Sequence, residues 1–340
     1  MMRCNPFQYE VPHITAQRSV IGIVGKFSQI ALFLFAKNGY SPPIINRLIA
    51  FIPMTIPLSV ISPDAQIGNN VEIGHFCVIE SGAIIGNACK LDSNVVIRSG
   101  VTIGDNNRFF SGAVIGEPPQ HVSALPPFGQ VRIGNNNVFR ENTTVHCSLK
   151  ESGITLIGND NYLMVGAHVA HDCVVGNSNI LVNNVMLGGH VIVGNRAMLG
   201  GGSAVHQNCR VGSLAMVGGQ AHVVQDVPPF VTVDGLSSRI VGLNLIGLRR
   251  NGRTSEDLRT LKYAYFTLYR SGMNWKEILQ YFQDNYSTGP VAELTQFLLT
   301  TKRGIVSERA ASRSQLRVAE TTESGIERSD APTTLRVNVG

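Results

Sequence analysis

The chain has 340 residues, of which 44% are hydrophobic, and a formal net charge of +5. This composition excludes a chain that is disordered throughout, and the length suits two domains or one long repetitive domain. Lysine and arginine are scattered rather than clustered, which argues against a nucleic-acid-binding protein. No apolar stretch reaches the roughly 18 residues of a membrane span, because Lys26 interrupts the apolar run over 20–36.

Residues 1–55 form an apolar, basic N-terminal extension in which Glu10 is the single acidic residue. Two functional interpretations stay open: a targeting segment for an organelle, and an amphipathic patch that makes peripheral contact with a membrane surface. A third interpretation is a helical extension that packs on the next domain, or a segment that is present only because of the translation start that was assigned.

A six-residue repeat follows and predicts the main domain, residues 56–230. Large apolar residues recur every six positions from 61 to 115, from 133 to 145 and from 157 to 223. A second phase, four positions later, carries small or slim residues such as Ala83 and Val95. Helices and ordinary strands do not repeat every six residues. The pattern predicts an all-β solenoid, a parallel β-helix with three short strands and about 18 residues per coil, in which both phases face inward.

The cysteines agree with this register. None of the six has Cys-x-x-Cys spacing, and four of them, Cys77, Cys89, Cys173 and Cys209, occupy the small inward phase. We therefore expect reduced core residues in a reducing compartment.

Two interruptions of the repeat predict projecting loops. An unbroken register would place His121, Pro127 and Glu151 in the core, which is costly for unpartnered polar groups. We expect loops at about 117–130 and 149–155, and the first of them is a candidate wall of a binding site.

A different pattern follows the repeat and predicts a linker and a helical domain over 231–306. Residues 254–257 resemble a capping box, and Leu258, Leu261, Tyr265 and Leu268 share one helical face behind it. A second helix is expected from Asn274 and a third apolar segment over 291–299. Residues 307–340 have few large apolar side chains, which predicts a disordered tail.

Clustered histidines suggest where chemistry takes place. A filled prism has no interior pocket, so a site must lie outside, in a groove formed with a loop or another subunit. Five histidines fall within about three coils, on phases that we expect to point outward: His146, His168, His171, His190 and His206.

Stacking of residues 18 apart brings specific groups together. Asp172 is expected beside His190, and His171 beside Gly189, whose missing side chain leaves an open slot over one imidazole. A histidine near a carboxylate can act as a general base, and the Gly189 N–H can face a developing oxyanion. Two alternatives stay open. The histidines could have a structural role, with their hydrogen bonds formed at a trimer interface, or they could bind zinc, which the flanking residues do not favour. We expect no metal and no cofactor.

Ordered motifs over residues 58–306 resemble the acyl-(acyl-carrier-protein):UDP-N-acetylglucosamine O-acyltransferase family, which begins lipid A synthesis. The resemblance rests on 167–173 (AHVAHDC), 183–184 (NN), 189–190 (GH), 204–207 (AVHQ), 217–219 (VGG), 225–229 (QDVPP), 244, 247–250 (GLRR) and 269–272 (YRSG). It implies a left-handed β-helix, a homotrimer and a location in the bacterial cytoplasm, or an organelle if the extension targets one. The implied reaction moves a 3-hydroxyacyl group from acyl carrier protein to the sugar's 3-hydroxyl.

The resemblance also implies roles for single residues. His171 would be the general base, aided by Asp172, and the Gly189 amide would polarise the thioester carbonyl. The implied substrate contacts are Gln120, His168, His190, His206, Gln207, Gly219, Asn244 and Arg250, with Gly219 where the acyl chain ends. A glycine there leaves room for a long acyl chain.

Four positions depart from the family pattern. His121 and Ser123 stand where the family has an acidic residue and a lysine, and Ile246 and Asn251 replace a glutamate and an arginine. These changes favour a paralogue that acylates another sugar nucleotide or an amino sugar. A trimeric scaffold without catalysis stays open as a separate interpretation.

Overall fold

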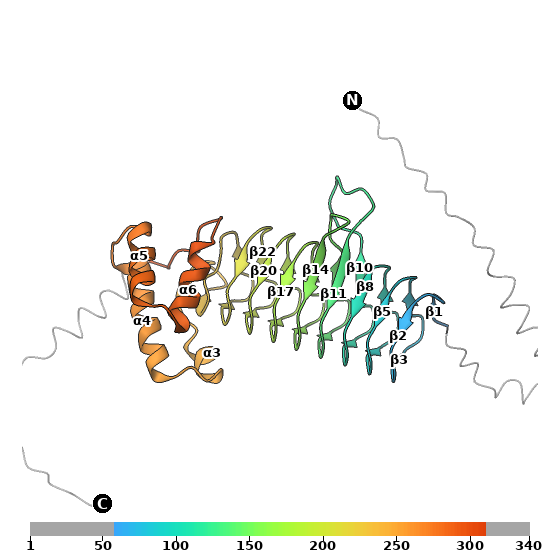
Figure 1. Cartoon of the computed structure of the whole chain (residues 1–340). Coiled ribbons are helices and arrows are strands. Elements are labelled where there is room, and N and C mark those ends of the chain that lie inside the picture. The colour runs from blue at the N-terminus through green and yellow to red at the C-terminus, as the bar shows by residue number, and fades with distance from the viewer. Residues whose placement is uncertain (1–57, 311–340) are drawn as a thin grey trace, which may run out of the picture. The chain divides into compact units, whose positions relative to one another are not determined.

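A computed structural model describes residues 58–310. The interpretations of the N-terminal extension, and the expected tail beyond 310, lie outside the described residues. Within them the chain winds into a parallel β-helix with helices at its C-terminal end (Figure 1). Among the described helices, none is long and apolar enough to cross a membrane.

Three parallel sheets form the sides of the coil. The first sheet contains β1 (Val60–Ile61), β4 (Val78–Ile79), β7 (Val96–Ile97), β10 (Val114–Glu117), β13 (Thr144–His146), β16 (His168–Val169), β19 (Met186–Leu187), β22 (Ala204–Val205) and β25 (His222–Val223). The second contains β2 (Gln66–Ile67), β5 (Ile84–Ile85), β8 (Val101–Ile103), β11 (Gln130–Ile133), β14 (Ile154–Ile157), β17 (Val174–Val175), β20 (Ile192–Val193) and β23 (Arg210–Val211). The third contains β3 (Glu72–Ile73), β6 (Lys90–Leu91), β9 (Arg108–Phe109), β12 (Val138–Phe139), β15 (Tyr162–Leu163), β18 (Ile180–Leu181), β21 (Met198–Leu199), β24 (Met216–Val217), β26 (Val231–Val233) and the antiparallel β27 (Ile240–Leu243).

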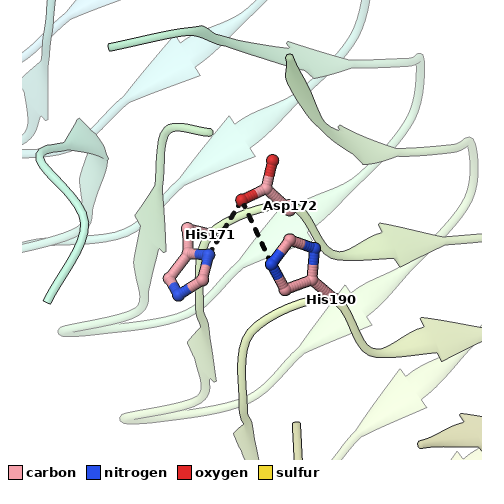
Figure 2. Close-up of side chains that lie close together, drawn as sticks. All are labelled: His171, Asp172 and His190. Carbon is pink, nitrogen blue, oxygen red and sulfur yellow. Dashed lines mark hydrogen bonds and ion pairs between the residues drawn. The ribbon is translucent and has the colours of Figure 1, made fainter. Parts of the chain in front are cut away.

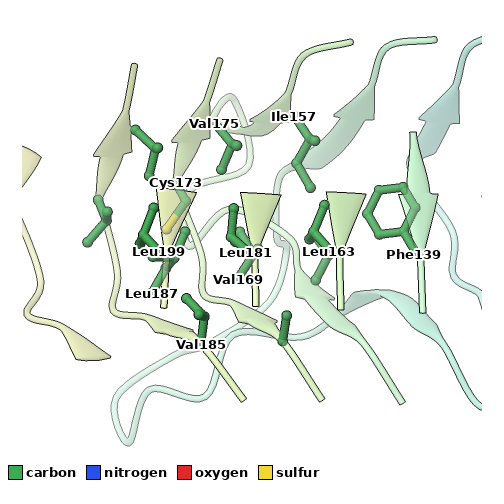
Figure 3. Close-up of a cluster of buried hydrophobic side chains, with 14 of the residues drawn as sticks. Phe139, Ile157, Leu163, Val169, Cys173, Val175, Leu181, Val185, Leu187 and Leu199 are labelled. Atoms are coloured by element: carbon green, nitrogen blue, oxygen red, sulfur yellow. The ribbon is translucent and has the colours of Figure 1, made fainter. Parts of the chain in front are cut away.

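The core confirms the predicted register. Leu163, Leu181 and Leu199 stack in successive coils and are fully buried (Figure 3). Each such side chain stabilises the fold by about 1.5–3 kcal/mol. At the start of the coil, Ile61 and Ile67 keep the register of the buried Ile79 and Ile85 but are 42% and 37% exposed. Among the described residues, this first coil has a neighbour on one side only.

The predicted core position of the cysteines is confirmed for the described residues. Cys77, Cys89, Cys173 and Cys209 are buried free thiols, and so is Cys147. Burial raises the pKa of the Cys173 thiol to about 12, so this side chain is a neutral core residue.

Both predicted loops project from the same corner of the prism, where the first sheet turns into the second. We call this the first corner. The first loop spans 118–129, because β10 ends at Glu117 and β11 begins at Gln130. The second spans 147–153, because β13 ends at His146 and β14 begins at Ile154. The longer loop rises from the coil between β10 and β11 (Figure 1).

A buried ladder of asparagines connects the coils at the opposite end of each second-sheet strand. The Oδ1 atoms of Asn107, Asn137 and Asn161 each accept the backbone N–H of the next asparagine at 2.9 Å, and Asn179 receives the last of these bonds. The partners lie 30, 24 and 18 residues apart, which shows how each loop lengthens one coil without disturbing its stacking. All four residues are at most 1% exposed.

Four helices follow the coil: α3 (Leu245–Arg250), α4 (Ser255–Arg270), α5 (Trp275–Asn285) and α6 (Gly289–Leu299). The expected capping box is present at Thr254, and Asn274 begins α5 with another. Leu261 and Phe282 pack with Phe230 of the coil in a second core.

The predicted start of the tail at 307 is wrong for the residues up to 310. Glu308 forms a bridge with Ile240 and accepts a hydrogen bond from the Tyr265 hydroxyl at 2.7 Å. Because β27 offers an unpaired edge there, this short segment is ordered in spite of its polar composition.

Candidate active site

His171 and Asp172 form the turn that follows β16 at the first corner. The His171 Nδ1 atom lies 2.8 Å from Asp172 Oδ2 (Figure 2). With Nδ1–H donating to the carboxylate, Nε2 carries a lone pair and can accept a proton. Although its phase was predicted to point outward, His171 is only 8% exposed in the single chain. Its ring lies against Gly189 of the next coil and beside His121 of the 118–129 loop.

Asp172 is held from several directions. The Ser148 hydroxyl donates to Oδ1, the Leu149 N–H donates to Oδ2 at 3.2 Å, and the Asp172 N–H donates to Thr155 Oγ1 at 2.8 Å. Burial by itself raises the pKa of the carboxyl, but the hydrogen bonds from Ser148, His171 and Leu149 outweigh burial and lower it below its usual range. The group is therefore a carboxylate at neutral pH and stabilises a positive charge on His171.

Gly189 supports the His171 ring from the next coil. A Cβ built on Gly189 would lie 2.6 Å from His171 Nε2. The predicted stacking is therefore confirmed, but the expected open slot is filled by the imidazole itself. Among the described residues, the Gly189 N–H donates no hydrogen bond, so it is available to an oxyanion.

His190 completes the near surroundings of this pair. Its Nε2 lies 3.8 Å from Asp172 Oδ2, as the 18-residue spacing predicted, and its ring meets that of His171 edge-on with centroids 5.1 Å apart. The side chain is 46% exposed, which leaves it open to a substrate (Figure 2).

His168 and His146 form a second pair on the first sheet, with ring centroids 5.1 Å apart. His168 Nδ1 is hydrogen-bonded to the Thr144 hydroxyl at 2.8 Å, and His146 Nδ1 donates to the Pro118 carbonyl at 2.6 Å. His146 was predicted to point outward, but it is only 3% exposed because the base of the 118–129 loop covers it. Burial, together with the neighbouring His146, lowers the pKa of His168 to about 4.

The 118–129 loop brings another imidazole to the site, as the prediction of a site wall anticipated. The exposed His121 lies edge-on to His171 with ring centroids 6.0 Å apart. The Ser123 N–H donates to His121 Nδ1 at 3.2 Å, which makes Nε2 the protonated nitrogen. Gln120 is exposed beside it on the same loop.

The remaining predicted site residues fall into two places. His206 and Gln207 are exposed at the first corner, one coil beyond Gly189. Gly219 lies at the corner between the third and first sheets, and Asn244 and Arg250 belong to the α3 region. No hydrogen bond or ion pair within residues 58–310 connects these last three to His171.

Asn244 also has a structural role that sequence reasoning missed. Its Oδ1 accepts the Gly247 N–H at 2.9 Å as the N-cap of α3, and its Nδ2 donates to the Leu214 carbonyl at 2.9 Å. Both ends of the amide are thus occupied within the chain, and only spare lone-pair and N–H capacity is left for a ligand.

A cavity of about 550 Å³ opens on the N-terminal side of the two loops. Its wall includes Glu117, Phe128, Cys147 and Glu151. His171 is not among its lining residues, so this cavity lies beside the histidine cluster and not over it.

His171, Asp172 and His190 place their ligand atoms within 4.8 Å of one another, close enough to consider a metal ion. Two ligands of a tetrahedral zinc ion lie about 3.3 Å apart. The 2.8 Å between His171 Nδ1 and Asp172 Oδ2 fits a hydrogen bond better.

Comparisons with known proteins agree on one family. Residues 226–306 match the family described as UDP N-acetylglucosamine O-acyltransferase, domain 2, and residues 82–117 match the bacterial transferase hexapeptide family. An acyl-(acyl-carrier-protein)–UDP-N-acetylglucosamine O-acyltransferase from Sulfurihydrogenibium sp. is 54% identical over 78% of this chain and 97% of its own length. A protein of the same name from Thermodesulfovibrio yellowstonii is 40% identical over 73% of this chain and 96% of its own.

Solved structures give the same result. The crystal structure of UDP-N-acetylglucosamine O-acyltransferase from Moraxella catarrhalis superposes with a TM-score of 0.72 at 37% identity, over 74% of this chain and 98% of that one. The UDP-N-acetylglucosamine acyltransferase from Arabidopsis is 33% identical with a TM-score of 0.64, over 74% and 99%. The coil is therefore the left-handed parallel β-helix that the resemblance implied, and the chain belongs to the family of acyl-(acyl-carrier-protein)–UDP-N-acetylglucosamine O-acyltransferases.

Proposed function

We propose that this protein is an acyltransferase that moves a 3-hydroxyacyl group from acyl carrier protein to the 3-hydroxyl of UDP-N-acetylglucosamine, the first step of lipid A biosynthesis. The family relationship supports the reaction class, since relatives that match over nearly their whole length carry this activity in their names. The geometry at His171 supports the chemistry.

In this mechanism His171 Nε2 removes the proton of the sugar hydroxyl while the oxygen attacks the thioester carbonyl. A tetrahedral intermediate forms, and its oxyanion accepts the Gly189 N–H. The C–S bond then breaks, and the His171 imidazolium returns its proton to the departing thiolate. Asp172, which stays ionised, stabilises the positive charge that His171 carries between the two proton transfers.

The single observation that supports this mechanism best is the contact between His171 Nδ1 and Asp172 Oδ2 at 2.8 Å. It fixes the tautomer in which Nε2 is the base, and Gly189 lies against the same ring with an N–H that has no partner within the described chain.

The complete site requires a second protomer. His171 with His168, His190, His206 and Gln207 would form one wall, together with Gln120 of the long loop. Gly219, Asn244 and Arg250, which lie far along the chain from this corner, would belong to the acyl and nucleotide subsites of a homotrimer. Size-exclusion chromatography with light scattering tests the oligomer, and a stable monomer would contradict it.

The function is tested with purified protein, hydroxyacyl carrier protein and a panel of sugar nucleotides. We expect turnover of UDP-N-acetylglucosamine, and a loss of about 10²- to 10⁴-fold in kcat for His171→Ala. Full turnover by His171→Ala would contradict the mechanism. Unchanged biological function of that variant in a cell that depends on the protein would favour the non-catalytic scaffold.

A second candidate acceptor, another sugar nucleotide or an amino sugar, is favoured by His121. Its imidazole stands 6.0 Å from the His171 ring, at a position where the family pattern has a carboxylate. Ser123, Ile246 and Asn251 change three further contacts. The same panel separates the two candidates, because the preferred acceptor is the one with the highest kcat/KM.

The bacterial cytoplasm is the location that fits most of these relatives. An organelle is the alternative, since one of the similar structures is an enzyme from the plant Arabidopsis. Mapping the mature N-terminus distinguishes them, since an organellar protein would lose part of residues 1–55. Peripheral membrane contact through that extension is tested by cosedimentation with anionic vesicles.

A further inference from the structure

Ser148 lies behind the catalytic pair, at the start of the 147–153 loop. Its side chain is fully buried, although it is a small polar residue in a loop. Its hydroxyl makes a short hydrogen bond to Asp172 Oδ1, and the N–H of the next residue, Leu149, reaches Asp172 Oδ2 at 3.2 Å. The two oxygens of one carboxylate are therefore held by adjacent residues of one loop.

The hydroxyl has a single proton to donate. Ser148 Oγ lies 3.2 Å from the Lys150 carbonyl and also 3.2 Å from the Lys150 N–H. An ionised carboxylate is the stronger acceptor, so the proton goes to Asp172 and the oxygen accepts the Lys150 N–H. Ser148 thereby connects the fold of the loop to the orientation of Asp172.

The surroundings of Ser148 leave the side chain little freedom. A Cβ added to Gly129, at the end of the other loop, would lie 2.9 Å from Ser148 Cβ, and one added to Gly153 would collide with Oγ. Backbone from both loops is therefore packed around this hydroxyl. A carboxylate has four lone-pair sites and rotates easily in water. Two donors, the Ser148 hydroxyl and the Leu149 N–H, hold that of Asp172 toward the imidazole.

We propose that Ser148 is a positioning residue for acyl transfer, which holds the Asp172 carboxylate in the orientation that fixes the His171 tautomer. This inference rests on the proposed function, in which His171 Nε2 is the base. It also explains what the 147–153 loop contributes, since this loop carries the donor pair formed by the Ser148 hydroxyl and the Leu149 N–H to the back of the site.

The test compares Ser148→Ala with Ser203→Ala in the full-length protein. Ser203 is also fully buried, but its Oγ has no hydrogen-bond partner among the described residues, so it controls for loss of a buried hydroxyl. We expect Ser148→Ala to lower kcat by about 10-fold, the usual cost of losing a hydrogen bond to a charged group. The KM for the sugar nucleotide should not change, because Ser148 does not touch substrate. Ser203→Ala should keep the kcat of the unmodified protein.

A double-mutant cycle separates positioning from a merely structural role. In the Asp172→Asn background, Ser148→Ala should cause no further loss of kcat, because the carboxylate that it orients is already gone. A loss that adds fully to that of Asp172→Asn would overturn the proposal, and so would a rise in KM with kcat unchanged. If Ser148→Ala does not fold, Ser148→Cys carries the same test, since a thiol keeps the packing but is a weak donor.

The two proposals fail in different ways. If Ser148→Ala has the same kcat as Ser203→Ala while His171→Ala is inactive, the positioning role is wrong and the proposed function stands. If His171→Ala keeps full turnover, both are wrong.

Discussion

The imidazole of His171 rests directly on the backbone of Gly189 in the next coil, at a separation that leaves no room for a side chain. The base is thus oriented from two sides, by Asp172 at Nδ1 and by Gly189 beside Cε1 and Nε2. The contact with Gly189 follows from the 18-residue spacing of successive coils, whereas the contact with Asp172 joins neighbouring residues of one turn.

Gly189 is the position where the smallest substitution should have the largest effect. Gly189→Ala would place a Cβ 2.6 Å from His171 Nε2 and push the ring out of line. We expect kcat to fall by about 100-fold with a stability loss of about 1–3 kcal/mol. Gly201→Ala is the control, because its Cβ would meet nothing closer than 3.4 Å. Equal kcat values for the two variants would refute the orienting role of Gly189.

The half-buried His168 should make stability depend on pH. Its pKa is about 4 in the folded chain, whereas an exposed histidine has about 6.5. Between these values the unfolded chain binds a proton that the folded chain does not, so the stability contribution falls as the pH drops from about 6.5 to about 4.

Denaturant titrations across this pH range measure the effect. His168→Asn should reduce the change in unfolding free energy over this pH range by about 2 kcal/mol, after allowance for the partial solvent exposure of the ring. His222→Asn removes an exposed imidazole from the same outward row and serves as the control. A His168→Asn curve as steep as that of the unmodified protein would contradict the assignment.

The asparagine ladder should be most sensitive in its interior. The Asn161 side chain makes three hydrogen bonds, to Asn137 Oδ1, to the Gly176 carbonyl and from the Asn179 N–H. The Asn179 side chain accepts one, from the Ala197 N–H, and its Nδ2 has no partner within the described chain.

We therefore expect Asn161→Ala to cost about 2–3 kcal/mol of unfolding free energy and Asn179→Ala about 1 kcal/mol. Denaturant titrations of both variants measure the difference. Equal losses would mean that burial alone, and not the ladder, sets the cost.

A buried ion pair connects the helical domain to the coil. Arg210 Nε donates to Asp226 Oδ2 at 2.9 Å, and the same guanidinium reaches the Phe297 carbonyl of α6 at 2.9 Å. Asp226 is 1% exposed. Asp226→Ala leaves Arg210 without its carboxylate and should cost about 3–5 kcal/mol.

Thermal unfolding and hydrogen exchange would report this loss, with the amides of α6 exchanging faster. Glu256→Ala, which removes an exposed pair with Arg259, is the matched control and should have no measurable effect. An Asp226→Ala protein as stable as this control would rule out the connecting role.

Much of the fold could be predicted because the repeat reports burial directly. Leu163, Leu181 and the other apolar residues of the same phase identify the strands, and the spacing of 18 correctly paired Asp172 with His190 and His171 with Gly189. The asparagine ladder also had a signal, since its members occupy the small inward phase, where an amide needs partners.

The remaining features depend on the course of the loops and of the C-terminal segment, which the six-residue repeat does not encode. His146 follows the inward Val145 and was expected outside, but the base of the 118–129 loop covers it and accepts its Nδ1–H at Pro118. Ser148 could not be singled out, because its partner Asp172 lies 24 residues away across a loop of unpredictable shape. Glu308 had no apolar pattern to mark it, yet it pairs with Ile240 at a free strand edge.

The catalytic groups occupy only a few neighbouring coils at one corner of a solenoid in which each coil contacts the coils beside it. The number of coils can therefore change without a change in activity. Duplicating one 18-residue unit in the N-terminal coils should yield a longer protein with an intact reaction centre, whereas the same insertion between Asp172 and His190 should divide that centre in two.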